Sequence, residues 1–425
     1  MAVVDPDFRR QRFSQAMSAM YRREVPRYGD LIELVSAINS RVLDGDPALA
    51  DSFDEAERAR LDQERHGAIR VGTPEELGLL RRMFAVLGMV PVGYYDLAAA
   101  GVPVHATAFR ATEPSSLAAS PFRVFTSLLR LELIADAALR QAAQEILARR
   151  RIVTPRALAL IERFEHAGGL DAPESQEFVR EALETFRWHA TATVDAATYD
   201  ALRQAHPLLA DVVWFGGPHI NHLTPRVLDI DAAQAAMLAR GLPAKEQIEG
   251  PPPRSCPVLL RQTSFKALSE PVRFGGSVGT HTARFGEIEQ RGVALTEAGR
   301  ARYDSWLASD KSHIMSSLPD NHAALREQDL AFYRYRRTGR PAPRGADLET
   351  ALAHGAVAAE PILYEDFLPV SAAGIFRSNL GDSAREADQP APRREALEAA
   401  LGCAIVDEVA LYRHQSQASA AACLG

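Results

Sequence analysis

The stretch His66-Gly-Ala-Ile-Arg70-Val71 returns later in the chain as His222-Leu-Thr-Pro-Arg226-Val227, with the same His-x-x-x-Arg-Val spacing. Each copy is strand-like and precedes a helical segment that stops at a glycine, Gly88 in the first case and Gly241 in the second. Three further strand-like runs follow each helix, over 89–97, 104–110 and 122–133 and then over 256–265, 272–274 and 282–293. Agreement in motif, element order and length predicts a duplicated β-α-β-β-β module.

The two modules divide the chain into five parts. We expect N-terminal helices over 1–62, the first module over 63–135, a helical insertion over 136–209, the second module over 210–295, and a helical and strand extension over 296–425. Within these parts, the residue pattern predicts two helices between 8 and 42 and an acidic, arginine-rich helix over 48–64. The polar stretch 296–355 is also expected to be helical, and 415–425 is expected to be a frayed tail.

Composition limits the classes of protein to which the chain can belong. Of its 425 residues, 47% are hydrophobic and 24% are charged, which is typical of a globular protein. The net charge of −7 does not favour a nucleic-acid-binding protein, and no segment is long and apolar enough to predict a membrane span. The widely separated Cys256, Cys403 and Cys423 are expected to be reduced thiols in a cytoplasmic protein. Arginine outnumbers lysine by 45 to 3, which we interpret as a base-composition habit with most arginines at the surface.

Two histidines stand out because they occupy equivalent places on the first strands of the two modules. If the modules pack around a pseudo-two-fold axis, the imidazoles of His66 and His222 converge. On the last strand of the second module, alternation by two places Glu287 and Glu289 on one face. Two imidazoles and one carboxylate form a facial triad that leaves open coordination positions on Fe(II), and either glutamate can complete it.

One arginine has a candidate role in substrate binding. Arg70 follows His66 by four residues, so both are expected on the same face of a strand. Its planar fork suits a substrate carboxylate better than a lysine would. His219 has the wrong parity for the face of His222 and is expected to be a supporting or structural residue. His105 and His281 can line strands as well, without a partner that the sequence identifies.

Longer runs around these residues resemble the bacterial 2-oxoadipate dioxygenase/decarboxylase family, also called hydroxyglutarate synthase. The resemblance extends to about Leu380 and is carried by Phe13-Ser-Gln-Ala-Met-Ser-Ala-Met20, Glu24-Val-Pro-Arg-Tyr-Gly29, Glu64-Arg-His-Gly-Ala-Ile-Arg70, His219-Ile-Asn-His-Leu-Thr-Pro-Arg226 and His281-Thr-Ala-Arg-Phe-Gly-Glu-Ile-Glu-Gln-Arg-Gly292. It implies an α+β fold of the vicinal-oxygen-chelate type, in which the two modules form a half-open barrel around a metal and carry large helical additions. The implied metal is Fe(II).

The resemblance also implies roles for individual residues. His66, His222 and one glutamate of the pair Glu287 and Glu289 would bind the iron. The run from Phe285 to Arg291 is similar to the metal-bearing strand of the related 4-hydroxyphenylpyruvate dioxygenases, which favours Glu287. Arg70 would be a catalytic residue that engages the substrate, and the pair Val370 and Ser371 would lie near the substrate.

The implied reaction converts 2-oxoadipate and O₂ to 2-hydroxyglutarate and CO₂, a step of lysine catabolism. The partners would be a small 2-oxo dicarboxylic acid and O₂, with neither nucleic acid nor membrane, and no oligomeric state follows. One alternative is another metal-dependent enzyme of the same fold, such as a glyoxalase-like isomerase or an extradiol dioxygenase. A second alternative is a helical binding protein in which the histidines and glutamates are structural.

Overall fold

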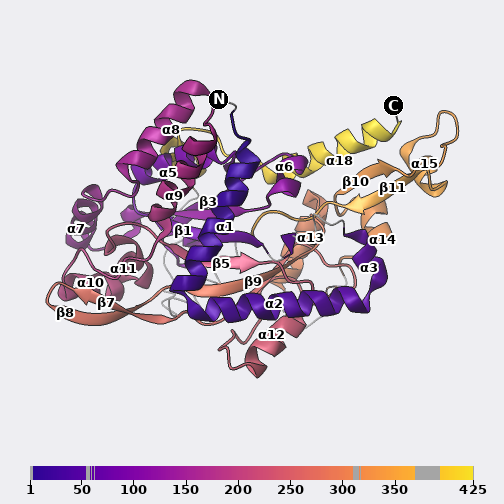
Figure 1. Cartoon of the computed structure of the whole chain (residues 1–425). Helices are drawn as coiled ribbons and strands as arrows, with labels where there is room; N and C mark the ends of the chain where they lie inside the picture. Colours follow the sequence, from indigo (N-terminus) through magenta and orange to yellow (C-terminus); the bar gives the residue numbers. More distant parts are fainter. Residues whose placement is uncertain are drawn as a thin grey trace. The chain divides into compact units, whose positions relative to one another are not determined.

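The computed structural model describes residues 3–53, 58, 60–61, 63–309, 315, 317–368 and 393–424 (Figure 1). The chain divides into two compact units. The first comprises Met1–Ile248, Gln262–Glu289 and Leu368–Val406, and the second comprises Glu249–Arg261, Gln290–Phe367 and Asp407–Gly425. In the described part of the chain, no helix combines the length and the apolar character that crossing a membrane requires.

A seven-stranded mixed sheet forms the centre of the first unit, in the order β2-β3-β4-β1-β5-β9-β6. Its strands are β1 (Glu64–Val71), β2 (Val90–Asp96), β3 (Val104–Arg110), β4 (Arg123–Leu129), β5 (Ile220–Pro225), β6 (Leu260–Ser264) and β9 (Phe285–Arg291). In both modules the first strand pairs in parallel with the last, β1 with β4 and β5 with β9. The two first strands, β1 and β5, meet antiparallel. This arrangement confirms the expected α+β class and its paired vicinal-oxygen-chelate modules.

The second module departs from the expected pattern at its third strand. The run predicted over 272–274 is part of β7 (Ser269–Phe274), which pairs with β8 (Ser277–Thr282) in a separate two-stranded sheet instead of joining the central one. The burial of the hairpin explains the difference. Most of its residues are at least partly exposed, and Val272, Phe274 and His281 are its buried positions.

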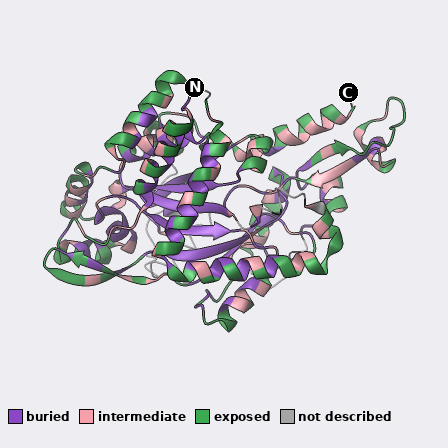
Figure 2. Ribbon diagram, viewed as in Figure 1, coloured by how far each residue is buried: buried purple, intermediate pink, exposed green. Residues whose placement is uncertain are grey.

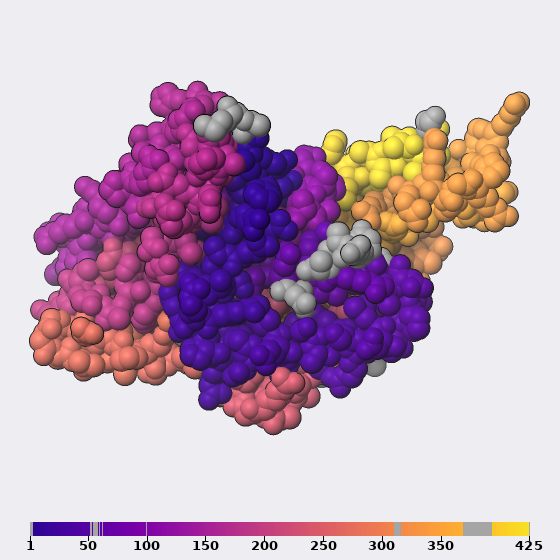
Figure 3. All heavy atoms as spheres, viewed as in Figure 1, coloured from indigo at the N-terminus to yellow at the C-terminus, as the bar shows by residue number. Residues whose placement is uncertain are grey.

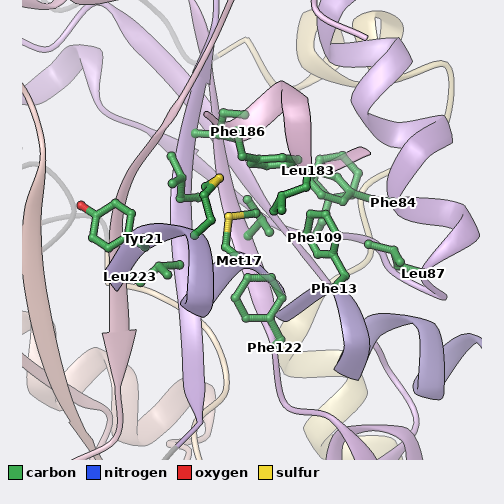
Figure 4. Packing of buried hydrophobic residues seen from close by; sticks show 14 of the residues in the cluster. Phe13, Met17, Tyr21, Phe84, Leu87, Phe109, Phe122, Leu183, Phe186 and Leu223 are labelled. Carbon is green, nitrogen blue, oxygen red and sulfur yellow. The ribbon is translucent and has the colours of Figure 1, made fainter. Parts of the chain in front are cut away.

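Helices that cover the central sheet supply much of the hydrophobic core. They include α1 (Pro6–Glu24), α2 (Pro26–Gly45), α5 (Pro74–Val86), α9 (Ala172–Leu183) and α12 (Ile230–Ala239). Phe13 of α1 packs edge-to-face against Phe122 and Phe186 (Figure 4). The strands of the central sheet are almost wholly buried, whereas the helices expose one face (Figure 2), and α1 and α2 form part of the outer surface seen in Figure 3. Aromatic burial of this kind contributes strongly to core stability.

Helix starts agree with the caps written in the sequence. At α5, the side chain of Thr73 accepts a hydrogen bond from the main-chain N–H of Glu76, and Pro74 occupies the first turn.

The insertion between the modules is helical, as expected. It contains α7 (Ala137–Ala148), α8 (Pro155–Ala167), α10 (Ala196–Ala205) and α11 (Pro207–Val213) in addition to α9. Of the helix expected over 48–64, the structure describes α3 (Pro47–Ser52) and helical residues at Arg58 and Arg60, whereas Glu64 instead begins β1.

The second unit corrects two expectations about the C-terminal part of the chain. The polar stretch 296–355 contains α13 (Glu297–Ala308), α14 (His322–Glu327) and α15 (Leu348–Ala353), but also β10 (Tyr333–Arg337), which pairs with β11 (Val357–Pro361). The frayed tail expected over 415–425 is instead the end of α18 (Glu408–Leu424). This helix lies against β10, where the Ser419 hydroxyl accepts a hydrogen bond from the main-chain N–H of Tyr335. The alanine-rich sequence of these residues also favours a helix.

Several arginines expected at the surface are buried. The largest fully buried side chains include those of Arg9, Arg10, Arg110 and Arg123. The guanidinium of Arg10, for example, donates hydrogen bonds to three main-chain carbonyls and forms an ion pair with Asp7. Because a guanidinium carries five N–H donors, one buried arginine can join several segments of chain. These residues are therefore structural ties, which composition alone did not indicate.

Candidate active site

The central strands bring His66, His222 and Glu287 together. His66 lies on β1 and His222 on the adjacent β5, and their ring centroids are 5.4 Å apart. Glu287 lies on β9, the next strand of the sheet. One ligand atom from each residue falls within 4.8 Å of the others, and all three residues are buried. The group therefore has the spacing of a site that can hold a metal ion.

One carboxylate oxygen is the focus of the cluster. Oε1 of Glu287 is 3.0 Å from Nε2 of His66 and 3.7 Å from Nε2 of His222. The same oxygen accepts hydrogen bonds from the Thr224 hydroxyl at 3.1 Å and from the Gln262 amide at 2.7 Å. Neither donor was expected from the sequence. Thr224 follows His222 by two residues on β5 and had a detectable signal, whereas Gln262 is on β6 and had none.

The protonation states suit a metal cation. Burial lowers the pKa of His222 to about 3, although the neighbouring carboxylate of Glu287 opposes this shift. Burial opposes ionisation of Glu287, but His222 and His66 outweigh it and lower the pKa of this carboxyl group. A neutral imidazole and a carboxylate are the forms that coordinate metals.

Two buried atoms of the cluster lack a hydrogen-bond partner among the residues that the structure describes. They are Oε2 of Glu287 and Nδ1 of His222. Buried polar atoms are otherwise almost always satisfied, so these two indicate a ligand such as a bound ion. The donor set of two imidazoles and one carboxylate fits a transition metal with open coordination positions.

Glu289 has a different position from Glu287. Its Oε2 lies 2.8 Å from Nδ1 of His66, the ring nitrogen on the opposite side from Glu287. Its Oε1 lies 3.7 Å from the guanidinium of Arg65. Histidines that bind metals commonly donate their second ring N–H to a carboxylate, which fixes the tautomer and the ring orientation. The geometry therefore favours Glu287 as a metal ligand and Glu289 as the residue that orients His66.

Arg70 is buried and contacts an aspartate that the sequence analysis missed. Its guanidinium forms an ion pair with Asp211 of α11. Burial opposes ionisation of Asp211, but Arg70 and the hydrogen bond from His281 outweigh it and hold the pKa of this carboxyl group well below its usual range. Asp211 could have been noticed in the sequence, because it is the only charged residue in the apolar run 208–215.

The three other histidines considered in the sequence fall into two groups. Nε2 of His281 is 2.9 Å from Oδ1 of Asp211, and Nε2 of His219 is 3.7 Å from the same atom. Both histidines therefore belong to the surroundings of Arg70. His105 lies on β3 beside the ring of Tyr94, and burial lowers its pKa to about 4. The other two substrate positions expected from the sequence, Val370 and Ser371, lie outside the described residues.

Comparisons with known proteins agree on one family. The model of the 2-oxoadipate dioxygenase/decarboxylase family matches residues 13–379. A 2-oxoadipate dioxygenase/decarboxylase from Escherichia coli (strain K12) is 54% identical over 440 residues, covering 99% of this chain and 98% of the relative.

Two solved structures are similar over almost the whole length of this chain. The crystal structure of the hydroxyglutarate synthase from Pseudomonas putida in complex with 2-oxoadipate is 53% identical, with a TM-score of 0.90 over 99% of this chain and 98% of that one. The crystal structure of an uncharacterized protein from Shigella flexneri has a TM-score of 0.91 and 51% identity, and the match covers 100% of both chains. Similarity at this level extends over the whole fold.

Proposed function

Because the chain belongs to the 2-oxoadipate dioxygenase/decarboxylase family, we propose that it converts 2-oxoadipate and O₂ to 2-hydroxyglutarate and CO₂. The observation that carries this proposal is the buried group of His66, His222 and Glu287 in a chain that is 54% identical to a relative named for the activity. The atoms balance, because those of 2-oxoadipate and O₂ equal those of 2-hydroxyglutarate and CO₂. No second 2-oxo acid is therefore required.

We propose that the metal is Fe(II) and that His66, His222 and Glu287 hold it. Two imidazoles and one carboxylate are the donor set of non-haem Fe(II) oxygenases, whereas closed thiolate sites suit structural zinc. When bound, Fe(II) supplies the redox chemistry and open positions for the 2-oxo acid and O₂. The protein's own contribution includes Glu289, which would keep His66 in the tautomer that presents Nε2.

Arg70 is the proposed binding residue for the distal carboxylate of the substrate. A guanidinium binds a carboxylate through paired N–H donors, and burial strengthens this attraction because little water competes. Arg70 is 5% exposed, so its charge acts inside the protein. Val370 and Ser371 stay predicted substrate contacts, and the cytoplasmic location and the role in lysine catabolism stay predictions.

The test is to load the purified chain with Fe(II) without oxygen and then to add 2-oxoadipate and O₂. We expect oxygen uptake, CO₂ release and a product with the mass of 2-hydroxyglutarate, in equal amounts. The same chain loaded with Zn(II) and the His66→Ala variant are the controls, and both are expected to be inactive. Conversion of a 2-oxo acid without oxygen uptake would instead support an isomerase, and no turnover by the Fe(II)-loaded chain would overturn the proposal.

A further inference from the structure

A continuous chain of polar contacts leads from Tyr199 to Arg70. The Tyr199 hydroxyl is 3.0 Å from Nδ1 of His281, and Nε2 of the same ring is 2.9 Å from Oδ1 of Asp211. The other oxygen of Asp211, Oδ2, forms the ion pair with Arg70. These four residues come from α10, β8, α11 and β1, so distant parts of the sequence converge on one guanidinium.

We propose that Asp211 is the positioning residue for Arg70 and that it thereby sets the preference for 2-oxo acids with a second carboxylate. This inference rests on the proposed function, since it assumes that Arg70 binds the distal carboxylate. An arginine side chain loses much of its conformational freedom when it is fixed. A guanidinium already held by Asp211 has lost that freedom before the substrate arrives, which favours binding.

An ion pair with Asp211 is compatible with a second carboxylate on the same guanidinium. The contact from Asp211 is made to one terminal nitrogen of Arg70. A guanidinium has five N–H donors in a planar fork, more than one aspartate oxygen can accept. Asp211 can therefore fix the plane of the fork while a substrate carboxylate binds to it as well.

Asp211 is itself held firmly, which a positioning role requires. It is 3% exposed, and the His281 ring that contacts it packs edge-to-face on Trp214 with ring centroids 5.0 Å apart. His219, the residue just before β5, lies near Oδ1 of Asp211, the oxygen that His281 also contacts. Rigid partners of this kind transmit orientation to the group they hold.

The outer end of the polar chain is more tolerant of change. Tyr199 and His281 line a cavity of about 180 Å³ together with hydrophilic residues that include Arg203, Thr280 and Thr282. A water molecule in such a polar cavity can replace a lost hydroxyl group. The effect of substitution should therefore decrease from Asp211 through His281 to Tyr199.

The experiment compares two substrates of equal chain length, 2-oxoadipate and 2-oxohexanoate, which lacks the distal carboxylate. For Asp211→Asn we expect kcat/KM for 2-oxoadipate to fall about ten- to hundredfold, chiefly through KM, because a charge-assisted contact is lost. The value for 2-oxohexanoate should change less than about threefold on the same reasoning. His281→Phe should shift the ratio between the substrates in the same direction but less, and Tyr199→Phe least.

Glu165→Gln is the matched control. It removes a carboxylate that pairs with Arg82 between α8 and α5. Neither residue contacts the polar chain or the metal group in the described part of the structure. This variant should keep both kinetic constants and the substrate ratio, which separates loss of an ion pair in general from loss of Asp211.

Binding measurements separate the inference from the proposed function. Calorimetric titration of the Mn(II)-loaded chain with 2-oxoadipate, without oxygen, should show weaker binding for Asp211→Asn at unchanged metal content. If the wild type binds 2-oxoadipate in this manner but does not turn it over, the proposed function fails and the positioning role stands. Equal losses on both substrates, loss of metal, unchanged kinetics or a wild type that does not bind 2-oxoadipate would overturn the inference. If Asp211→Asn does not fold, an unchanged substrate ratio in His281→Phe overturns it.

Discussion

The two glutamates of β9 allow a sharp test of the metal centre, because they contact opposite sides of one imidazole. Glu287 lies 3.0 Å from Nε2 of His66, and Glu289 lies 2.8 Å from Nδ1 of the same ring. Replacing either with glutamine keeps the size of the side chain and removes its charge. We predict that Glu287→Gln abolishes stoichiometric metal binding, whereas Glu289→Gln retains the metal with reduced affinity.

The expected magnitudes follow from these two positions. Loss of a carboxylate that orients a metal-binding histidine typically lowers metal affinity ten- to hundredfold, or by about 1.4 to 2.8 kcal/mol. This is the change expected for Glu289→Gln. Glu287→Gln should have a larger effect, because it removes a ligand and the negative charge that offsets the cation. In addition, Oε1 of Glu287 accepts hydrogen bonds from Thr224 and Gln262. If the new glutamine turned its NH₂ group toward these two residues, three hydrogen-bond donors would face one another.

The assay is a competition titration of Fe(II) or Mn(II) against a chelator, with bound metal measured by mass spectrometry and folding by circular dichroism. Glu165→Gln is again the control, because it removes a carboxylate from the surface pair with Arg82. A Glu289→Gln variant that loses more metal than Glu287→Gln would reverse the assignment of the ligand. Equal affinities in both variants and the wild type would refute the metal site at this position.

Three further predictions concern stability. A Cβ atom at Gly67 would lie 2.8 Å from Cδ1 of Ile220, so Gly67→Ala should lower the free energy of unfolding by about 1–3 kcal/mol, as measured by chemical denaturation. Arg10→Ala should cost about 2–4 kcal/mol in the same assay, since three main-chain carbonyls, two of them buried, lose their donor, whereas the exposed Arg156→Ala should leave the free energy of unfolding nearly unchanged. Burial lowers the pKa of His105 from 6.5 to about 4, so between these pH values His105 is protonated in the unfolded chain but neutral in the folded chain. Stability should therefore decline as the pH falls through this window, by up to about 1.4 kcal/mol per unit from this group, and His105→Asn should flatten the slope.

The fold could be predicted because the residue patterns of its strands and helices are local and occur twice in the chain. The pattern around His66 recurs around His222, and both copies form strands that meet at the centre of the sheet. The limits of the prediction are equally physical. Whether a short strand joins the central sheet or forms a separate hairpin depends on which side chains become buried, and Val272 and Phe274 do not distinguish these outcomes in the sequence. In the same way, the last residues of α18 are helical because β10 supports them.

The site was partly predictable for a similar reason. His66, His222 and the two glutamates could be found because each lies at a definite position of a repeated strand pattern. Asp211 could be noticed as a lone charge in an apolar run, but its contact with Arg70, like that of Gln262 with Glu287, could not be assigned, since both pairings join residues far apart in the chain. The buried arginines were misjudged because a guanidinium looks the same in the sequence whether it meets water or a buried carbonyl.

Duplication accounts for the two converging histidines of the proposed metal site, but not for Arg70, the proposed substrate-binding arginine. The equivalent of Arg70 in the second module, Arg226, lies over the ring of Phe53, with its guanidinium carbon 5.5 Å from the ring centroid. Arg70 differs because it meets Asp211, and Asp211 lies on α11, a helix that comes before β5 and outside the repeated strand-and-helix pattern. A symmetric pair of strands can supply two converging imidazoles, but a dicarboxylate with two different ends requires an asymmetric site. The helices α10 and α11 supply that asymmetry, so they are part of the proposed substrate-binding machinery.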